Sequence, residues 1–270
     1  MKTKNLNISV LLLAFLLLAS ILSVHFAKKN ILFMACKHGY LDLVKILVVY
    51  PGVDINELDI EGKSPLFVAS SNGHENLVSF LLEKGALMTK GNQLSPLWIA
   101  AFGGHENIVK VLINAGADLN SSTDDGGASS IHVASQNGHQ KVIDVLLNNG
   151  DNVNKSTSSG ASPLFLAAQN GHEQVAQLLI KKGAHVNQKK YDGTSPLWAA
   201  AYFGFDNIVK ILVNSNADVN LKNNAHISPI DAACLKRKYE IVRYLRTKGA
   251  LIDGKIFQSH CRVGDMKLTN

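Results

Sequence analysis

"SPLWIAAFGGHENIVKVL" (Ser95–Leu112) and "SPLWAAAYFGFDNIVKIL" (Ser195–Leu212) are close copies of each other within one chain of 270 residues. A degenerate copy, "NILFMACKHGYLDLVKIL", begins at Asn30. Self-similarity at a fixed period is typical of a repeat architecture in which each copy is one supersecondary unit. The serine of the motif recurs at intervals of 31, 34, 33, 33 and 33 residues, at Ser64, Ser95, Ser129, Ser162, Ser195 and Ser228.

Each copy predicts a pair of helices. Ser64 is placed to cap the first helix, and Pro65 stands at its first position, where the missing N–H is not needed. Gly73 supplies the left-handed residue that ends this helix. Glu75 then opens a second helix at its positive end, and Gly85 ends it. In the sixth copy Asn216 takes the left-handed position instead of glycine.

The spacing of apolar residues predicts how the units pack. Ile108, Val111 and Leu112 recur at helical spacing on the second helix, and Ala100 and Ala101 keep one face of the first helix small. A single unit of this size cannot bury its own apolar face. Neighbouring units must therefore stack into an all-α repeat, a solenoid of helix-turn-helix units joined by glycine-bearing polar loops.

The motif resembles the ankyrin repeat, which has a period of 33 residues and the signature T-P-L-H-x-A. Serine replaces the threonine throughout, and the signature histidine is kept only at His132. The resemblance implies an ankyrin solenoid with β-hairpin-like loops, and a histidine that bridges each helix start to the next repeat. A large aromatic residue at that position substitutes packing area for hydrogen bonds. The histidine is replaced in the other copies by Phe67, Trp98, Phe165, Trp198 and Asp231.

The copies divide the chain into consecutive units. We expect a signal peptide or signal anchor first and a tail or truncated repeat last, in which "CRVGDMKL" (Cys261–Leu268) aligns with "CKHGYLDL" (Cys36–Leu43) and covers the array as a lid. In the seventh unit, Asp231 and the run Arg237–Tyr239 make that end of the array polar. The predicted boundaries are 1–27 for the signal or anchor, 28–60, 61–91, 92–125, 126–158, 159–191, 192–224 and 225–254 for repeats 1 to 7, and 255–270 for the tail.

The first residues have the composition of a targeting segment. Lys2 and Lys4 precede the apolar stretch Val10–Leu22, in the order of a secretory signal peptide. The cleavage site is not clearly marked, because His25 stands two positions before Ala27. Two readings therefore stay open. Either the segment is removed from a secreted protein, or residues 8–26 remain as a single-pass signal anchor.

The chain has three cysteines, and this small, odd number does not predict a disulfide framework. Cys36 and Cys234 occupy the same small-residue position six packing steps apart, which is far beyond the reach of a disulfide. We expect both to be small buried side chains and Cys261 to have an accessible thiol.

Composition and motifs argue against catalysis. The chain is 46% apolar and 18% charged, as expected for a folded protein. It contains no nucleophile elbow, phosphate loop or dinucleotide motif. The recurring His74, His105, His139 and His172 are spaced by whole repeats, so we expect no metal site. The net charge of +6 lies mainly after Ser228 and lacks interleaved aromatics, which argues against nucleic acid. We expect no enzyme activity, cofactor or small-molecule substrate.

What remains is a binding surface. The resemblance implies that the concave face and loop tips bind a protein partner, and exposed aromatic residues mark such sites. We expect a monomeric, secreted interaction module; the alternative is a membrane-anchored scaffold or regulatory protein whose repeats face the cytosol. The sequons at Asn120 and Asn154 predict glycosylation if the chain is exported. The predicted partner-binding residues are Phe102, Tyr191, Tyr202, Phe203 and Phe205.

Overall fold

The computed structural model of the chain describes residues 29–88, 95–122, 126–253, 256 and 261. Their backbone is helical apart from turns, loops and one isolated bridge between Ser122 and Ser129. The chain divides into two compact units, residues 1–96 and 97–270, and the boundary falls at the start of α5. The expected all-α repeat fold is confirmed within the described residues.

The described residues of the first unit form two helix pairs. Residues 29–38 are helical and are followed by α2, and the second pair is α3 and α4. The ring of His74 lies over Gly39 and Nε2 is 2.9 Å from the Lys37 carbonyl oxygen, so the second pair attaches to the first. The helices are α2 (Leu41–Val49), α3 (Pro65–Ser71) and α4 (Glu75–Glu83).

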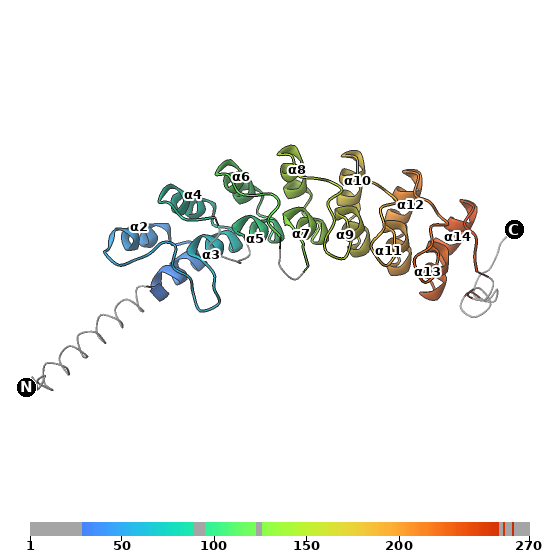
Figure 1. Ribbon diagram of the computed structural model, residues 1–270, viewed down its shortest axis with the longest axis horizontal. Helices are drawn as coiled ribbons and strands as arrows, with labels where there is room; N and C mark the ends of the chain where they lie inside the picture. Colours follow the sequence, from blue (N-terminus) through green and yellow to red (C-terminus); the bar gives the residue numbers. More distant parts are fainter. Residues whose placement is uncertain (1–28, 89–94, 123–125, 254–255, 257–260, 262–270) are drawn as a thin grey trace, which may run out of the picture. The chain divides into compact units, whose positions relative to one another are not determined.

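The second unit contains five further pairs, arranged as two rows (Figure 1). The first helix of each pair packs on the first helix of its neighbour, as α9 does on α7 and α11, and the second helices form the parallel row. The first helices are α5 (Pro96–Phe102), α7 (Ser130–Gln136), α9 (Pro163–Asn170), α11 (Pro196–Phe203) and α13 (Pro229–Leu235); the second helices are α6 (Glu106–Asn114), α8 (Gln140–Asn148), α10 (Glu173–Lys181), α12 (Asp206–Asn214) and α14 (Tyr239–Thr247).

The helices begin and end where the repeated residues predict. The hydroxyl of Ser162 accepts a hydrogen bond from the Phe165 N–H, and Pro163 fills the first helical position. Gly171 then ends α9 in the left-handed conformation with φ of 82°, which a Cβ atom disfavours. Asn216 takes this conformation after α12, with φ of 65°, as predicted. Equivalent serine caps begin α3, α11 and α13.

The core runs between the two rows. In α11, Ala199, Ala200 and Ala201 are all buried, and their small side chains let α9 and α13 approach closely. Ile208, Val209 and Leu212 of α12 fill the space behind them. The predicted apolar spacing of the second helix is therefore what brings the two rows together.

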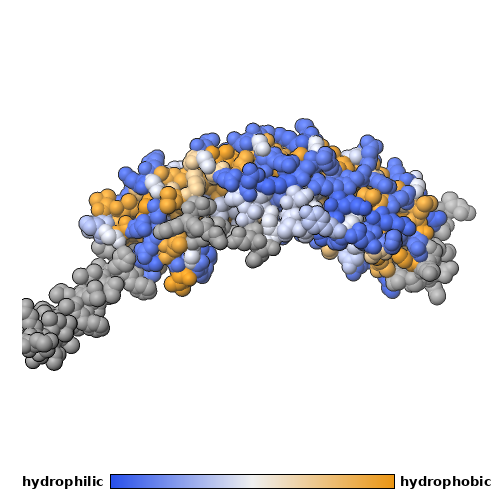
Figure 2. Space-filling view, in the orientation of Figure 1, coloured by the Kyte–Doolittle hydropathy of each residue, from blue (hydrophilic) through white to orange (hydrophobic). Residues whose placement is uncertain are grey.

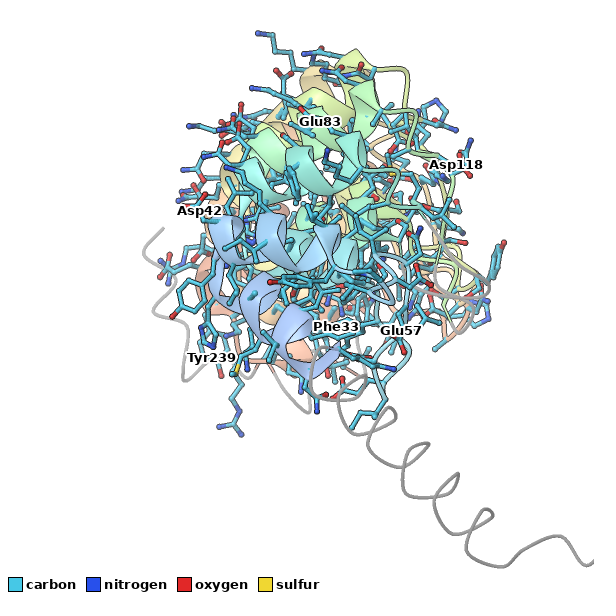
Figure 3. The ribbon with its side chains drawn as sticks, turned by 90° about the vertical axis from the view of Figure 1, so that its left-hand side faces the viewer. Phe33, Asp42, Glu57, Glu83, Asp118 and Tyr239 are labelled. Carbon is cyan, nitrogen blue, oxygen red and sulfur yellow. A yellow bond between two sulfur atoms is a disulfide. The ribbon has the colours of Figure 1, made fainter. Side chains whose placement is uncertain are left out.

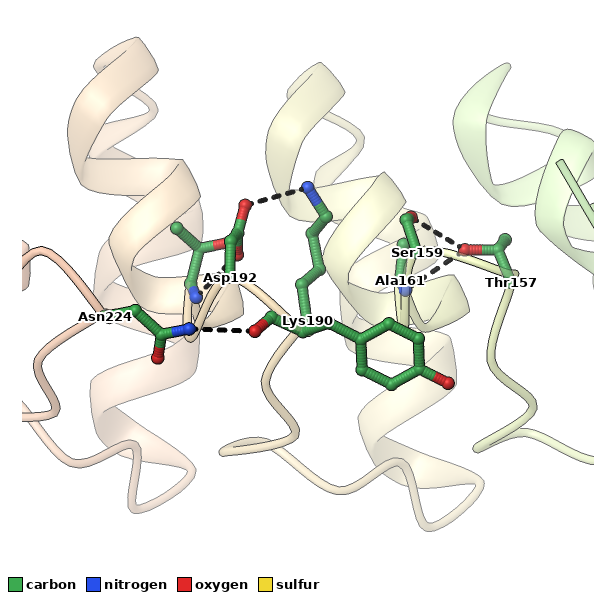
Figure 4. Close-up of polar contacts among 8 residues, drawn as sticks. Thr157, Ser159, Ala161, Lys190, Asp192 and Asn224 are labelled. Carbon is green, nitrogen blue, oxygen red and sulfur yellow. Dashed lines mark hydrogen bonds and ion pairs between the residues drawn. The ribbon is translucent and has the colours of Figure 1, made fainter.

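Loops between consecutive pairs form short hairpin tips. The Lys190 N–H donates to the Thr194 carbonyl across a turn in which Gly193 has φ of 82°, and Asp192 accepts from the N–H and hydroxyl of Thr194. Asn224 of the next tip donates to the Tyr191 carbonyl (Figure 4). Adjacent tips are thus linked into a second continuous layer beside the first helices.

The cysteine prediction was right about the burial of Cys36 and Cys234 but missed a disulfide and was wrong about the exposure of Cys261. Cys234 of α13 forms a disulfide with Cys261, with 5.5 Å between their Cα atoms, and both are fully buried. Cys261 therefore has no accessible thiol. The error arose because spacing was compared only between whole repeats, whereas Cys261 lies after the last pair. Cys36 is free and buried, as expected, and burial raises its pKa to about 12.

The lid predicted from residues 261–268 lies outside the described residues apart from Cys261, and so does the signal or anchor segment. In the part of the chain that the structure describes, no helix has both the length and the apolar character required to cross a membrane.

Candidate functional site

The largest aromatic group on the first-helix row lies at the end of α11. The rings of Trp198 and Tyr202 are stacked with centroids 4.9 Å apart, and Phe203 meets Tyr202 edge to face at 5.1 Å. Phe205 follows at 6.5 Å from Phe203. Three of the five predicted partner-binding residues therefore form one cluster, which we call the α11 aromatic cluster (Trp198, Tyr202, Phe203 and Phe205).

A lysine adds positive charge to this cluster. Lys236 follows α13, and its Nζ lies 4.5 Å from the centroid of the Tyr202 ring, a cation–π distance. Lys236 was not among the predicted partner-binding residues, although it stands at the position equivalent to Phe203, where the repeats differ. Lys236 could have been identified from the stacking of repeats, because the end of each first helix lies beside the end of the first helix before it.

Phe205 has a second role within the fold. In four other pairs this position is histidine. His172, for example, lies over Gly138, and its Nε2 is 2.7 Å from the Gln136 carbonyl oxygen. The Phe205 ring covers Gly171 in the same way but has no N–H to donate. Phe205 is only partly exposed, so Phe203, which is 43% exposed, offers more of the surface to a partner.

Phe102 and Tyr191 lie apart from the cluster. Phe102 ends α5 and stacks on Trp98, with centroids 5.6 Å apart, and its side chain is exposed. Tyr191 extends from a hairpin tip, and its ring lies over Gly160 of the preceding tip. The two residues are exposed as predicted, but each forms a separate contact point on the surface.

The signature position of the first helix carries a buried polar network in two pairs. His132 is fully buried; its Nδ1 accepts hydrogen bonds from the N–H and hydroxyl of Ser129, so Nε2 donates to the Lys155 carbonyl at 3.0 Å. Burial lowers the pKa of His132 to about 4. The histidine is therefore neutral at physiological pH and fixes the start of α7 to the following loop.

Asp231 holds the equivalent position in α13 and corrects our expectation that it makes the end of the array polar. Its side chain is fully buried. Oδ2 accepts from the N–H and hydroxyl of Ser228, and Oδ1 accepts from the Asp253 N–H at 2.9 Å. The carboxylate caps the helix and holds the segment that follows α14.

The two tryptophans at this position behave differently. Trp98 Nε1 donates to the Ala128 carbonyl at 3.0 Å and so keeps the bridge to the next repeat that the histidine provides. Trp198 Nε1 is buried and has no acceptor among the described residues. The predicted replacement of hydrogen bonding by packing thus describes Trp198 but not Trp98.

The two sequon asparagines also differ. Asn154 Nδ2 donates to the Gly183 carbonyl, and Oδ1 accepts from the His185 N–H, as Asn56, Asn187 and Asn220 do in their own loops. Asn120 is exposed, and its Oδ1 accepts from Lys155 Nζ. Its Nδ2, the atom that carries a glycan, makes no hydrogen bond to a residue that the structure describes.

Histidine, cysteine and carboxylate groups do not converge within the described ranges to form a site of three or more metal ligands. His74, His139 and His172 instead each contact one carbonyl oxygen of the preceding pair. The arrangement provides aromatic surface, hairpin tips and scattered charge, which suit recognition of another macromolecule.

Comparisons with known proteins cover almost the whole chain. The family described as "Ankyrin repeats (3 copies)" matches residues 12–92, 32–123, 97–190 and 164–256. The crystal structure of the human ASB11 ankyrin repeat domain is similar, with a TM-score of 0.72 and 27% identity, covering 79% of this chain and 96% of that one.

Curated relatives match over shorter stretches. BTB/POZ domain-containing protein 3 of Schizosaccharomyces pombe is 51% identical over 53 residues, which is 20% of this chain and 10% of that protein. Alpha-latrocrustotoxin-Lt1a of Latrodectus tredecimguttatus is 40% identical over 63 residues, 23% of this chain and 4% of the toxin. The chain thus spans a small part of the relatives it matches, and the similarity concerns the repeats.

Proposed function

Because this chain belongs to the ankyrin-repeat family, we propose that it is a non-catalytic interaction module that binds a protein partner through the concave face and the loop tips. The fold is generally used as an interaction scaffold. The observation that carries the proposal is the α11 aromatic cluster with Lys236 above Tyr202. Rigid aromatic residues beside a cation supply large contact area at low entropic cost.

The test is a matched pair of double variants. Tyr202→Ala with Phe203→Ala removes the partly exposed Tyr202 ring and the exposed Phe203 ring. Gln169→Ala with Asn170→Ala changes the equivalent positions of α9. A partner captured by in-cell cross-linking to the full chain is expected to be lost with the first pair and kept with the second. Equal retention by both variants, with unchanged circular dichroism, contradicts a role for the cluster.

For localisation, we propose that residues 1–27 direct the chain into the secretory pathway and that the repeats are secreted; the alternative is a single-pass membrane protein anchored by residues 8–26. The Cys234–Cys261 disulfide supports an oxidising compartment, because disulfides persist outside the cytosol. Expression of the full chain with a C-terminal tag distinguishes secretion from membrane retention. A wholly reduced cytosolic product contradicts both.

Glycosylation follows from the same proposal, and the two sequons are not equivalent. Asn120 is exposed and its Nδ2 makes no hydrogen bond to a described residue, whereas Asn154 is bonded through both Nδ2 and Oδ1 to the next loop. Asn120→Gln is therefore expected to remove the glycosidase-sensitive mass shift and Asn154→Gln to leave it. The converse result contradicts this assignment.

A further inference from the structure

The first helix pair exposes a group of apolar side chains that has no equivalent elsewhere among the described residues. Figure 2 shows apolar residues gathered over this part of the molecule, and Figure 3 looks onto it, with Phe33 and Asp42 labelled. All five residues are more than a third exposed, and four of them stand at positions that are buried in a later pair. We call this group the N-terminal face: Ile31, Met34, Leu43, Ile46 and Val49.

Comparison with a later pair shows what this face is. Ile31, Met34, Leu43 and Ile46 align with Ser130, Val133, Val142 and Val145, all of which are buried in α7 and α8, and α8 packs on α6 of the preceding pair. Met34 is 58% exposed and Ile46 is 55% exposed, whereas Val133 is 4% exposed. The N-terminal face therefore has the composition of a buried surface but no described residue covers it.

The second helix of this pair differs in the same way. α2 has the sequence LDLVKILVV, whereas α12 has DNIVKILVN, with polar residues at the outward positions. Asp42 and Lys45 are exposed and charged on α2, but Leu41 and Val49 extend its apolar surface beyond that of α12. At Val49, which is 83% exposed, α12 has the exposed Asn214.

The rim of the face has the composition found at a membrane interface. Tyr40 and Tyr50 are exposed beside it, and Lys37 and Lys45 lie on the same two helices, Lys45 paired with Asp42 at 3.1 Å. Tyrosine and lysine concentrate at the level of lipid headgroups, because each has an apolar body and a polar end.

Connectivity places this face near the bilayer if residues 8–26 remain in a membrane. Ile31 follows Phe26 by five residues, a distance of about 8 Å in a helix and about 17 Å when extended. The polar region on each side of a bilayer is about 5–7 Å thick. A repeat that begins this close to a span has no linker with which to leave the surface.

We propose that the N-terminal face rests in the interfacial region of a phospholipid bilayer, with its apolar side chains among the outer acyl carbons and Lys37 and Lys45 at headgroup level. The inference rests on the membrane-anchored form of the proposed function. It adds that the first repeat is a membrane-contacting element and that partner binding is left to the other repeats.

The experiment uses the full chain reconstituted into phosphatidylcholine and phosphatidylglycerol vesicles. Val49→Cys and its matched control Asn214→Cys are each labelled with an environment-sensitive fluorophore. Labelling is selective because Cys36 is buried with its pKa raised to about 12, and Cys234 and Cys261 are bonded to each other. Nitroxide-bearing lipids are expected to quench the label at position 49 several-fold and to leave the label at position 214 unchanged.

A second variant tests the face itself. Ile46→Glu places a charge in the apolar group and is expected to abolish quenching at position 49 while circular dichroism stays unchanged. Energy transfer between labels on separate molecules would show that a second copy covers the face. Shielding from aqueous iodide without lipid quenching would show that residues 12–28, which the ankyrin match includes, fold back over it. Either result overturns the proposal.

The failure of this inference can be distinguished from failure of the binding function. A mature N-terminus after the apolar stretch removes the anchor and overturns the membrane contact, yet leaves the effect of Tyr202→Ala and Phe203→Ala on the partner intact. If Tyr202→Ala and Phe203→Ala no longer affect the partner but the label at position 49 is still quenched, the binding function is overturned and the membrane contact stands.

Discussion

His132 and Asp231 occupy the same position of two helix pairs and are both fully buried, but the hydrogen bonds that they make to the following segment have opposite directions. His132 donates to the Lys155 carbonyl, whereas Asp231 accepts from the Asp253 N–H. Both accept from the capping serine. The residue type at this position therefore depends on whether the next segment offers a backbone carbonyl or a backbone N–H.

Exchanging one residue for the other breaks this relation and has the largest expected effect. In His132→Asp the carboxylate would face the Lys155 carbonyl without a donor, so the free energy of unfolding should fall by about 3–5 kcal/mol. Urea denaturation measures the loss. His226→Asp, at an exposed hairpin tip, is the control and should change stability by less than about 0.5 kcal/mol.

The pH dependence of stability isolates His132. Its pKa is about 4 in the folded protein and about 6.5 when unfolded, so between these values the unfolded chain binds a proton that the folded chain does not. Stability should be fully present above pH 6.5 and should fall by roughly 3 kcal/mol as the pH drops to about 4. His132→Phe should lack this component in pH-dependent denaturation, and an unchanged profile would contradict the assignment.

Asp231→Asn is a smaller change at the other member of the comparison. The amide keeps one acceptor oxygen, but its NH₂ group must face one of the donors that the carboxylate accepts. We expect a loss of about 1–3 kcal/mol, together with faster hydrogen exchange of the Asp253 amide. Asp218→Asn keeps the acceptor for Asn220 N–H and serves as the exposed control.

The smallest expected effect compares the tryptophans at the same position. Trp98→Phe removes the bond to the Ala128 carbonyl, whereas Trp198→Phe removes an N–H that has no acceptor among the described residues. Trp98→Phe should therefore cost about 1 kcal/mol more than Trp198→Phe. Paired thermal and urea denaturation of the two variants measures the two costs, and equal costs would contradict the difference.

Much of the fold could be predicted because its determinants are local. Ser162 caps α9 through the residue three positions later, and Gly171 ends it through its own backbone conformation. The candidate site could be predicted only in part. Tyr202 and Phe203 adjoin each other in the chain, but Lys236 reaches Tyr202 from the next pair, a contact that depends on how two helices stack.

By itself the sequence determined the period, the helix ends, the ankyrin-type fold and the apolar composition of the first repeat, because caps, glycines and helical spacing act over a few residues. Only the tertiary structure decided that Cys234 pairs with Cys261, that Asp231 is buried, that Trp98 finds an acceptor and that Asn154 is bonded to the next loop. Each of these depends on which groups from different repeats meet, and burial then decides whether a polar atom must be paired.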